Sequence, residues 1–392
     1  MRKTINIGDL GTIITGKTPP TTNKNYYGDY AVFIKPTDIS EQSKYTYETE
    51  EMYSKLAAEK YESSLIPKGA ICVPCIGTIG TKMTMTPCDC YTNQSINSII
   101  CNENYDNEYV YYLIKNFLPG LKAYNLGTAS GREYVSKSNF EKIELVAEQD
   151  QEIQKKIGII LSRYDSLIEN YQKQIKLLEE AAQRLYKEWF VDLRFPGHEN
   201  TKIVDGVPEG WEKKRLIDLV DVQYGYAFDG KLFNSSGEGM PILRIRNIPD
   251  GITSDYTTEE AQDCYIVHNG DIVVGMDGIF HINSWSGGDA YLVQRACSFR
   301  PKEECMKGFI VQAIQEPIKF FEKTLVGATV AHLGKKHIDS IELCIPKNFE
   351  LYKPFSKFYN QRQGLLSQIR LLTEARDRLL PKLMSGEINV ES

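Results

Sequence analysis

Apolar residues recur in alternating steps of four and three over the stretch from residue 153 to residue 190. This spacing is the a/d pattern of a coiled-coil helix. Acidic residues at 148, 150 and 152 place negative charge where a helix N-terminus favours it. One helix cannot bury such a stripe, so the pattern predicts a helix of roughly 55 Å that packs on a partner helix. The stripe begins with Ile153, Ile157, Ile160, Tyr164, Leu167 and Tyr171.

A second helix with a similar pattern is predicted over residues 351–380, at an offset of 198 residues from the first. Pro381 is predicted to end it. Arg362 and Arg376 fall within its apolar stripe. Two interpretations of these arginines are open: they extend their charged ends from the edge of the coil, or they fix its register or face carboxylates of a partner subunit.

The segments before the two helices also resemble each other, which indicates an internal duplication. Residues 1–145 and 196–345 both read as many short strands with a few helices. Gly16 matches Gly225 at an offset of 209, and Ile143 matches Ile341 at an offset of 198. We expect an α/β (α+β) fold in which two mixed domains are joined by two long helices that form an antiparallel coiled coil with pseudo-two-fold duplication. The predicted parts are 1–147, 148–195, 196–346 and 347–392.

Composition places the chain among ordinary globular proteins, with 42% hydrophobic and 25% charged residues. No apolar run approaches the roughly 20 residues of a membrane span, so no membrane association is expected. The N-terminal residues do not form a secretion signal. Nine cysteines, an odd number, are typical of reduced thiols and predict a cytoplasmic location.

The net charge of −6 argues mildly against general binding of polyanions. Residues 196–345 hold 15 basic and 22 acidic side chains, a balance of −7. Any contact with DNA there would depend on local clusters, such as Arg244 with Arg246 or Lys335 with Lys336.

Four cysteines form the one pattern that suggests a metal. Cys72, Cys75, Cys88 and Cys90 could supply a zinc knuckle. However, Cys72 and Cys75 lie in an apolar strand and, at an odd separation, point to opposite faces. Thiols buried in the core are therefore preferred and no metal site is expected, and the five histidines show no metal spacing. Motifs of methyltransferases, phosphate loops and dinucleotide turns are absent from the sequence, which favours a non-catalytic role.

Two similar but non-identical domains on a long spacer suit a divided, asymmetric target on double-stranded DNA, where successive major grooves lie about 34–36 Å apart. The sequence also resembles the specificity subunit of type I restriction-modification systems. The resemblance covers almost the whole chain. It rests on residues 15–19, 34–38, 75–80 and 92–94 in the first half, and on 274–278, 294–297, 327–333 and 379–386 in the second.

The resemblance implies a DNA-binding subunit without catalysis of its own. Each target recognition domain (1–147 and 196–346) would read one half of a bipartite double-stranded site, and the coiled coil would set their spacing. Two modification subunits would methylate adenine N6 with S-adenosylmethionine, and restriction subunits would cleave DNA with ATP and Mg²⁺. These cofactors would belong to the partner subunits, and none is expected in this chain.

Base edges are read by side chains with paired donors, supported by threonine and aromatic contacts. Loop residues of these types are candidates, with Lys17 and Arg246 preferred, although many are equally explained as solvated or turn-forming residues. The candidates are Lys17, Thr18, Asn23, Tyr26, Tyr27, Thr78, Lys82, Asn93, Gln94, Arg132, Tyr226, Lys231, Arg244, Arg246, Asn247, Gln294, Arg295, Lys335 and Lys336.

Two other functions are open on the sequence alone. The duplicated domains could form a protein-binding scaffold without DNA, which the acidic second half favours weakly. A zinc-dependent enzyme built on the cysteine cluster ranks third.

Overall fold

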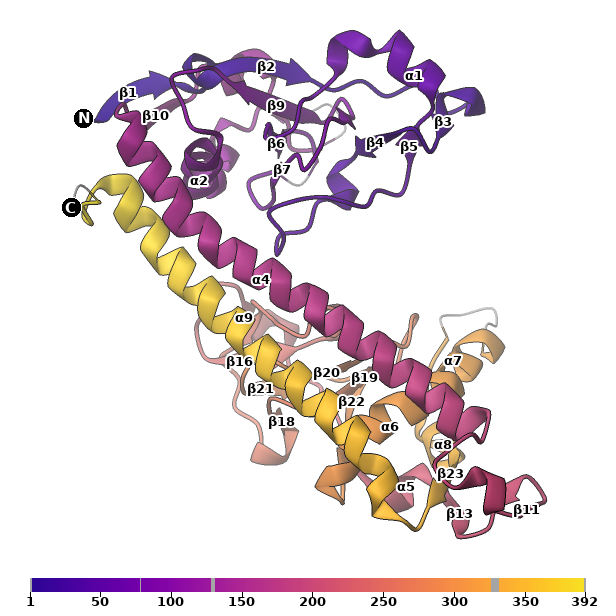
Figure 1. Ribbon diagram of the computed structural model, residues 1–392. Coiled ribbons are helices and arrows are strands. Elements are labelled where there is room, and N and C mark those ends of the chain that lie inside the picture. The colour runs from indigo at the N-terminus through magenta and orange to yellow at the C-terminus, as the bar shows by residue number, and fades with distance from the viewer. Residues whose placement is uncertain (1, 78, 128–130, 326–330, 391–392) are drawn as a thin grey trace. The chain divides into compact units, whose positions relative to one another are not determined.

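The chain folds into two compact units in the computed structural model, which describes residues 2–77, 79–127, 131–325 and 331–390 (Figure 1). Unit 1 comprises Met1–Asn170 with Arg370–Ser392, and unit 2 comprises Tyr171–Ile369. Two long helices, α4 (Gln151–Tyr186) and α9 (Lys353–Ser385), each contribute one part to both units.

Unit 1 contains two four-stranded sheets, in the orders β2-β9-β6-β7 and β3-β5-β4-β8, and the antiparallel pair β1-β10. Its short helices are α1 (Lys55–Lys60), α2 (Asn107–Phe117) and α3 (Lys137–Glu141). Its strands are β1 (Arg2–Asn6), β2 (Gly11–Thr15), β3 (Tyr27–Gly28), β4 (Ala31–Ile34), β5 (Met52–Tyr53), β6 (Ile71–Pro74), β7 (Thr84–Met85), β8 (Tyr91–Thr92), β9 (Ile96–Cys101) and β10 (Glu144–Glu148).

The core of unit 1 forms around α2, whose apolar and tyrosine side chains are almost all buried. Asp106 begins this helix by accepting a hydrogen bond from the Tyr109 backbone N–H at 3.0 Å. Gly158 of α4 lies directly against it, since a Cβ there would come within 2.8 Å of the Glu108 Cβ. The absence of a side chain at Gly158 therefore allows α4 to approach α2 closely.

Unit 2 contains the sheet β14-β22-β19-β20, the sheet β15-β17-β16-β21-β18, and the pairs β13-β23 and β11-β12. Its short helices are α5 (Leu216–Leu219), α6 (Lys307–Ala313), α7 (Gln315–Thr324) and α8 (Lys335–Asp339). Its strands are β11 (Ile203–Val204), β12 (Val207–Pro208), β13 (Trp211–Arg215), β14 (Val220–Tyr224), β15 (Phe233–Asn234), β16 (Met240–Leu243), β17 (Tyr256–Thr257), β18 (Ile266–Val267), β19 (Ile272–Gly275), β20 (Ile282–Ser284), β21 (Ala290–Leu292), β22 (Ala296–Pro301) and β23 (Glu342–Pro346).

The two units repeat one topology, which confirms the predicted duplication. The order β2-β9-β6-β7 of unit 1 returns as β14-β22-β19-β20 of unit 2, and β1-β10 returns as β13-β23. In both units a parallel pair, β4 with β8 and β16 with β21, lies within the second sheet. The offset between matched strands falls from 209 for β1 and β13 to 198 for β10 and β23, as expected for short length changes in loops.

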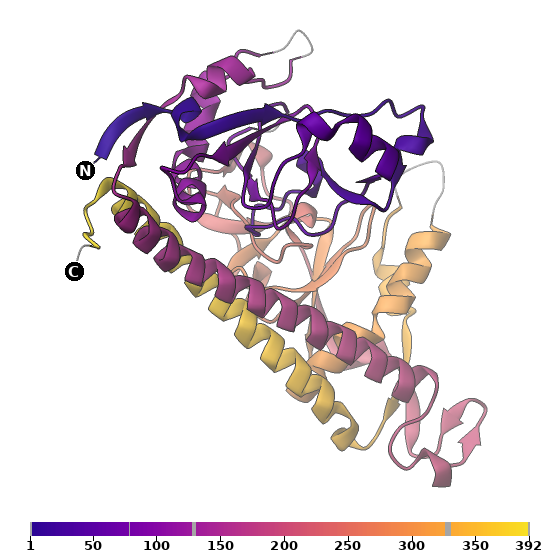
Figure 2. The ribbon, with the colours of Figure 1, turned by 45° about the horizontal axis from the view of Figure 1, so that its top comes forward.

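Parts of α4 and α9 pack side by side and antiparallel within each unit, as both views show (Figures 1 and 2). In unit 1 the start of α4, at Ile157 and Leu161, shares a core with the end of α9, at Leu380 and Leu383. In unit 2 the end of α4 meets the start of α9, where the rings of Tyr186 and Phe355 lie 6.4 Å apart. The two helices thus pair as predicted.

The predicted end of the second helix at Pro381 is wrong. The helix continues to Ser385 with Pro381 inside it. Leu383 and Met384 are buried in the core of unit 1, and this burial offsets the hydrogen bond that proline removes. Arg2 secures the end, because its Nε and Nη2 atoms donate to the carbonyls of Met384 and Leu383, each at 3.0 Å.

The predicted stripe of the first helix is partly wrong. Leu167 is 45% exposed, whereas its neighbour Ile168 is buried. Leu161, outside the predicted stripe, is also buried. The helix packs on its own domain as well as on α9, so its buried face is wider than a coiled-coil seam and includes positions that a strict heptad omits.

No helix among the described residues combines the length and hydrophobicity needed to cross a membrane. Cys72 in β6 and Cys75 directly after it behave as predicted for a core strand. Cys72 and Cys75 are both buried but belong to separate clusters of apolar residues on opposite sides of the strand. Cys90 shares the cluster of Cys72, whereas Cys88 is exposed.

Candidate nucleic-acid interface

In unit 1 a glycine turn after β2 brings several predicted DNA-contacting residues together. A Cβ at Gly16 would lie 2.1 Å from the carbonyl oxygen of Thr92, so only glycine permits this approach. The Lys17 backbone N–H donates to the same oxygen at 2.9 Å. Next to it the Thr18 hydroxyl donates to the Gln94 side-chain oxygen. The exposed side chains of Lys17, Thr18 and Gln94 therefore lie close together on unit 1.

Tyrosine hydroxyls stabilise this turn by hydrogen bonds to its backbone carbonyls. The Tyr53 hydroxyl donates to the Lys17 carbonyl at 2.5 Å, and the Tyr27 hydroxyl donates to the Pro19 carbonyl at 2.9 Å. Lys60 donates to the hydroxyl of Tyr26 at 2.6 Å. Tyr26 and Tyr27 are thus half-buried supports more than free contact groups.

Two further candidates of unit 1 have mainly backbone roles. Asn23 caps a short helical turn by accepting from the Asn25 N–H at 3.2 Å. Asn93 accepts from the Ser95 N–H at 3.0 Å and so shapes the loop before β9. Both side chains are half-buried.

The remaining candidates of unit 1 lie near the end of β6. Lys82 is half-buried in the connection from β6 to β7. Arg132 is exposed in a loop that approaches β6 through the bridge between Ile76 and Tyr134. Thr78 lies outside the described residues.

Unit 2 builds the same turn with different side chains. A Cβ at Gly225 would lie 2.2 Å from the Val293 carbonyl oxygen. The Tyr226 N–H donates to the Leu292 carbonyl at 2.9 Å, and the Gln294 N–H donates back to Tyr226 at 2.8 Å. Tyr226, Gln294 and Arg295 therefore occupy the positions that Lys17, Gln94 and Ser95 occupy in the first unit.

A second element of unit 2 carries three candidates in a short turn after β16. The Arg244 N–H donates to the Asn247 side-chain oxygen at 2.9 Å, just as the Lys35 N–H donates to Asp38 at 2.7 Å in unit 1. Asn247 is therefore a capping residue. Arg244 stacks its guanidinium over the Phe233 ring at 5.4 Å.

Arg246, one of the two preferred candidates, is held by a carboxylate that sequence reasoning missed. Its Nη2 atom lies 2.6 Å from both oxygens of Asp255, and its Nε atom donates to the same side chain at 3.2 Å. The donors that read a base in pairs are thus already engaged. Lys17, the other preferred candidate, keeps an exposed side chain.

Lys231, Lys335 and Lys336 are exposed at other places in unit 2. The Lys231 N–H donates to the Asp229 side chain at 3.0 Å in a short turn before β15. Lys335 and Lys336 lie on α8, which packs against α5. Lys335 pairs with Asp339 at 2.8 Å, the i,i+4 spacing typical of a solvated helix face.

Asp277 joins the predicted candidate Arg295 to His332, a grouping that the sequence did not reveal. Its carboxylate accepts from His332 Nδ1 at 2.5 Å and from Arg295 Nη1. Burial acts to raise the pKa of Asp277, but the hydrogen bonds from His332 and Arg295 outweigh it and leave the pKa below its ordinary value. The lowered pKa favours the ionised form of the Asp277 carboxylate, which lies between His332 and Arg295.

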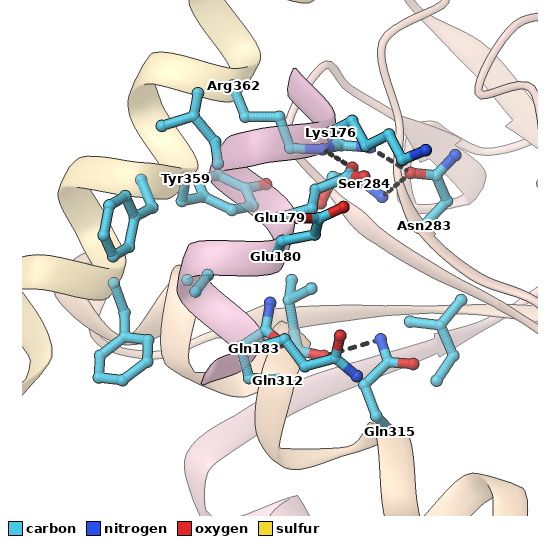
Figure 3. A pocket seen from close by; sticks show the side chains of 17 residues that line it. Lys176, Glu179, Glu180, Gln183, Asn283, Ser284, Gln312, Gln315, Tyr359 and Arg362 are labelled. Carbon is cyan, nitrogen blue, oxygen red and sulfur yellow. Dashed lines mark hydrogen bonds and ion pairs between the residues drawn. The ribbon is translucent and has the colours of Figure 1, made fainter. Parts of the chain in front are cut away.

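The long helices contribute a second polar region, a pocket of about 410 Å³ within unit 2 (Figure 3). Arg362 crosses it, donating through Nε to Glu179 at 2.6 Å and through Nη2 to Asn283 at 2.9 Å. Both acidic and basic side chains line the pocket, including Lys176, Glu179 and Glu180. Arg362 is thus tied inside its own unit to both α4 and β20.

The model of the type I restriction modification DNA specificity domain matches residues 2–180 and 208–370 of the chain. These two segments cover most of the sequence and coincide with the duplicated topology. The chain belongs to this family.

Two relatives from the specificity-domain family illustrate the range of similarity. The MjaIX specificity subunit of a type I restriction enzyme from Methanocaldococcus jannaschii is 27% identical, over 98% of this chain and 93% of its own length. The HindI specificity subunit from Haemophilus influenzae is 37% identical over 163 residues, which are 40% of this chain and 35% of that subunit. A solved S subunit of a type I restriction-modification system from M. genitalium covers 98% of this chain and 96% of its own, with a TM-score of 0.55 and 17% identity. This last likeness shows a shared fold.

Membership of the specificity-domain family agrees with the residues quoted from the sequence. Segments 15–19 and 34–38 form the turns after β2 and β4, and segments 92–94 and 294–297 lead into β9 and β22. Segments 75–80 and 274–278 lie at the ends of β6 and β19, and 379–386 lies at the end of α9. Residues 327–330 of the remaining segment lie outside the described residues. Glycine and threonine runs revealed these backbone positions. They did not reveal that Asp255 pairs with Arg246 or that Asp277 pairs with Arg295, because the partners of each pair lie in different loops, 9 and 18 residues apart.

Proposed function

We propose that this chain is the DNA-recognition subunit of a type I restriction-modification complex. Each repeat would read one half of a bipartite double-stranded site, and the complex would methylate adenine N6 through modification subunits and cleave through restriction subunits. The observation that carries this proposal is the repeated glycine turn at Gly16 and Gly225. It presents different polar side chains from the same backbone frame in the two units.

The difference between the two turns supports an asymmetric target. Lys17, Thr18 and Gln94 occupy the first turn, whereas Tyr226, Gln294 and Arg295 occupy the second. Side chains that pair donors and acceptors with base edges discriminate sequence, and different sets select different half-sites. We assign the recognition domains to 1–147 and 196–346, and the helical regions to 148–195 and 347–392.

The proposed partners follow from this role. They are double-stranded DNA, two modification subunits and restriction subunits, and they would act in the cytoplasm. S-adenosylmethionine, ATP and Mg²⁺ would be bound by those subunits and not by this chain. The membership of the chain in the specificity-domain family and the names of its relatives support these assignments.

The proposal is tested by mapping methylated adenines in DNA from cells that carry or lack this gene, with the modification subunit present in both. We expect one bipartite motif that disappears when the gene is deleted. Binding of the purified chain to a duplex with this motif should weaken steeply with salt, because phosphate contacts release counterions. A protein-binding scaffold would produce neither result.

A further inference from the structure

Arg295 adopts a backbone conformation that is unusual for its residue type. Its φ is 70°, in the left-handed region that glycine and asparagine accept readily and long side chains rarely adopt. The other described non-glycine residues with positive φ, Leu193 and Asp205, lie in the connection between α4 and β13. Among the described residues, Arg295 is the one that lies between strands present in both repeats.

The fold does not require this conformation. In unit 2 the Arg295 carbonyl accepts from the Met276 N–H at 2.8 Å, and in unit 1 the Ser95 carbonyl accepts from the Cys75 N–H at 2.7 Å. Ser95 makes the equivalent bond without a positive φ. The left-handed conformation at this position is therefore particular to the second repeat. Retained strain of this kind is typical of functional sites.

The side chains around Arg295 are also particular to the second repeat. Asp277 bridges to His332 at the position where Ile76 bridges to Tyr134 in the first repeat. The set of Arg295, Asp277 and His332 thus replaces Ser95, Ile76 and Tyr134. The second repeat therefore contains a cluster with charged side chains where the first repeat contains uncharged side chains.

The Arg295 guanidinium is oriented by its ion pair with Asp277, but this pair does not use all of its hydrogen-bond donors. It donates to Asp277 through Nη1, and its side chain is 66% exposed, whereas the Asp277 side chain is 13% exposed. Arg246, by contrast, donates through both Nε and Nη2 to Asp255. A guanine presents two acceptors, O6 and N7, in the major groove, and an arginine reads them with two donors. The Nε and Nη2 donors of Arg295 are not used by Asp277.

We propose that Arg295 reads a guanine in the half-site bound by the second repeat, with Asp277 as the positioning residue that fixes its guanidinium and His332 as the group that holds Asp277. This inference rests on the proposed function. The anionic Asp277 restricts the conformations of the Arg295 side chain before DNA binds. The side chain therefore loses less conformational entropy on binding.

The test compares methylated motifs in cells that carry the parent gene, Arg295→Gly, Arg295→Lys or Asp277→Asn together with the modification subunit. Arg295→Gly should lose discrimination at one G·C pair of one half-site by roughly 5- to 150-fold, the range expected for one bidentate contact. The other half-site should be unchanged. Arg295→Lys keeps the charge but lacks the planar fork of donors, so it should show a smaller loss at the same pair. Asp277→Asn should relax the same pair by a smaller factor.

The melting temperature distinguishes a role of Arg295 in base recognition from a purely structural role. Glycine accepts the backbone conformation at residue 295, so the melting temperature of Arg295→Gly should equal or exceed that of the parent. A lower melting temperature with an unchanged motif would show that Arg295 only ties loops together. Arg215→Ala is the matched control, because Arg215 also pairs with an aspartate, Asp218 at 3.1 Å, but lies at the end of β13. It should leave every position of the motif unchanged.

The outcomes for the two proposals are distinct. A parent strain without any bipartite motif overturns the proposed function, and this inference with it. A parent motif whose relevant half-site contains no G·C pair, or which Arg295→Gly leaves unchanged, overturns the assignment of Arg295 alone. Relaxation of both half-sites would also overturn it.

Discussion

Asp165 of α4 and Arg376 of α9 form an ion pair in which the side chains are only 5% and 8% exposed. The Tyr112 hydroxyl donates to the other oxygen of the same carboxylate. Burial acts to lower the pKa of the Arg376 guanidinium, but Asp165 and Asp377 outweigh it and raise the pKa above its ordinary value. Of the two interpretations of Arg376, this contact supports a role in fixing the register of the helices.

Breaking this pair from one side should destabilise unit 1 strongly. Arg376→Leu leaves Asp165 charged and buried without its partner, and we expect a loss of about 3–5 kcal/mol in the free energy of unfolding. Asp165→Leu combined with Arg376→Leu should recover most of this loss, because no unpaired charge remains. Urea unfolding of both single variants and the double variant measures the effect. Lys335→Ala, which removes an exposed pair, should change stability by no more than about 0.5 kcal/mol.

The turn glycines should be intolerant of any side chain. Gly16→Ala and Gly225→Ala each drive a Cβ into a backbone carbonyl, and we expect each to cost about 1–3 kcal/mol or more in the unit that contains it. Calorimetry should show a different transition lowered by each variant. Gly364→Ala is the contrasting case, since nothing lies within 4 Å of its Cβ position in α9. It should stabilise the helix by about 0.5–1 kcal/mol, and equal effects at all three sites would refute the argument.

The exposed Lys17 and the paired Arg246 should differ in DNA binding. If Lys17 contacts a phosphate, Lys17→Ala lowers the slope of log K against log salt by about 0.9. Arg246→Ala should change that slope less, because Asp255 already engages its guanidinium. Titrations of the purified variants with a duplex that carries the methylated motif, at several salt concentrations, measure both slopes. Undiminished affinity of Lys17→Ala would remove Lys17 from the interface.

Thiol reactivity should follow burial. Burial raises the pKa of Cys72 and of Cys75 to about 12, so both remain neutral thiols at pH 8. Cys88 and Cys264 are exposed and should be alkylated first in the native protein, with Cys72 and Cys75 reacting only after unfolding. Mass spectrometry after a timed reaction measures this order. Because unfolded thiols ionise near pH 8.5, these buried thiols should also cause stability to fall as pH rises above about 9.

The duplication and both long helices could be predicted because hydrophobic spacing and repeated glycines are local signals. The details of packing could not. Asp165 is buried although its side chain is charged, so hydrophobic spacing did not mark its position. Its partner Arg376 is 211 residues away in the sequence. Pro381 continues a helix because Leu383 and Met384 beyond it are needed in the core, which no local rule reveals.

The candidate interface likewise contains residues that the sequence identified and residues that only the structure revealed. Residues beside the glycine turns, such as Lys17 and Gln94, were identified from local motifs, and the structure brings them together. The aspartates that occupy Arg246 and Arg295 belong to other loops, so their effect on the availability of each arginine emerges only from the three-dimensional fold.

The last residues of α9 have a consequence for biosynthesis. Leu380, Leu383 and Met384 close the core that begins with Ile7 and Leu10. The ribosome makes the first part of unit 1 before unit 2 and supplies these side chains only after unit 2. The unit whose synthesis starts first therefore acquires its final core residues last, after all of Tyr171–Ile369 has been made.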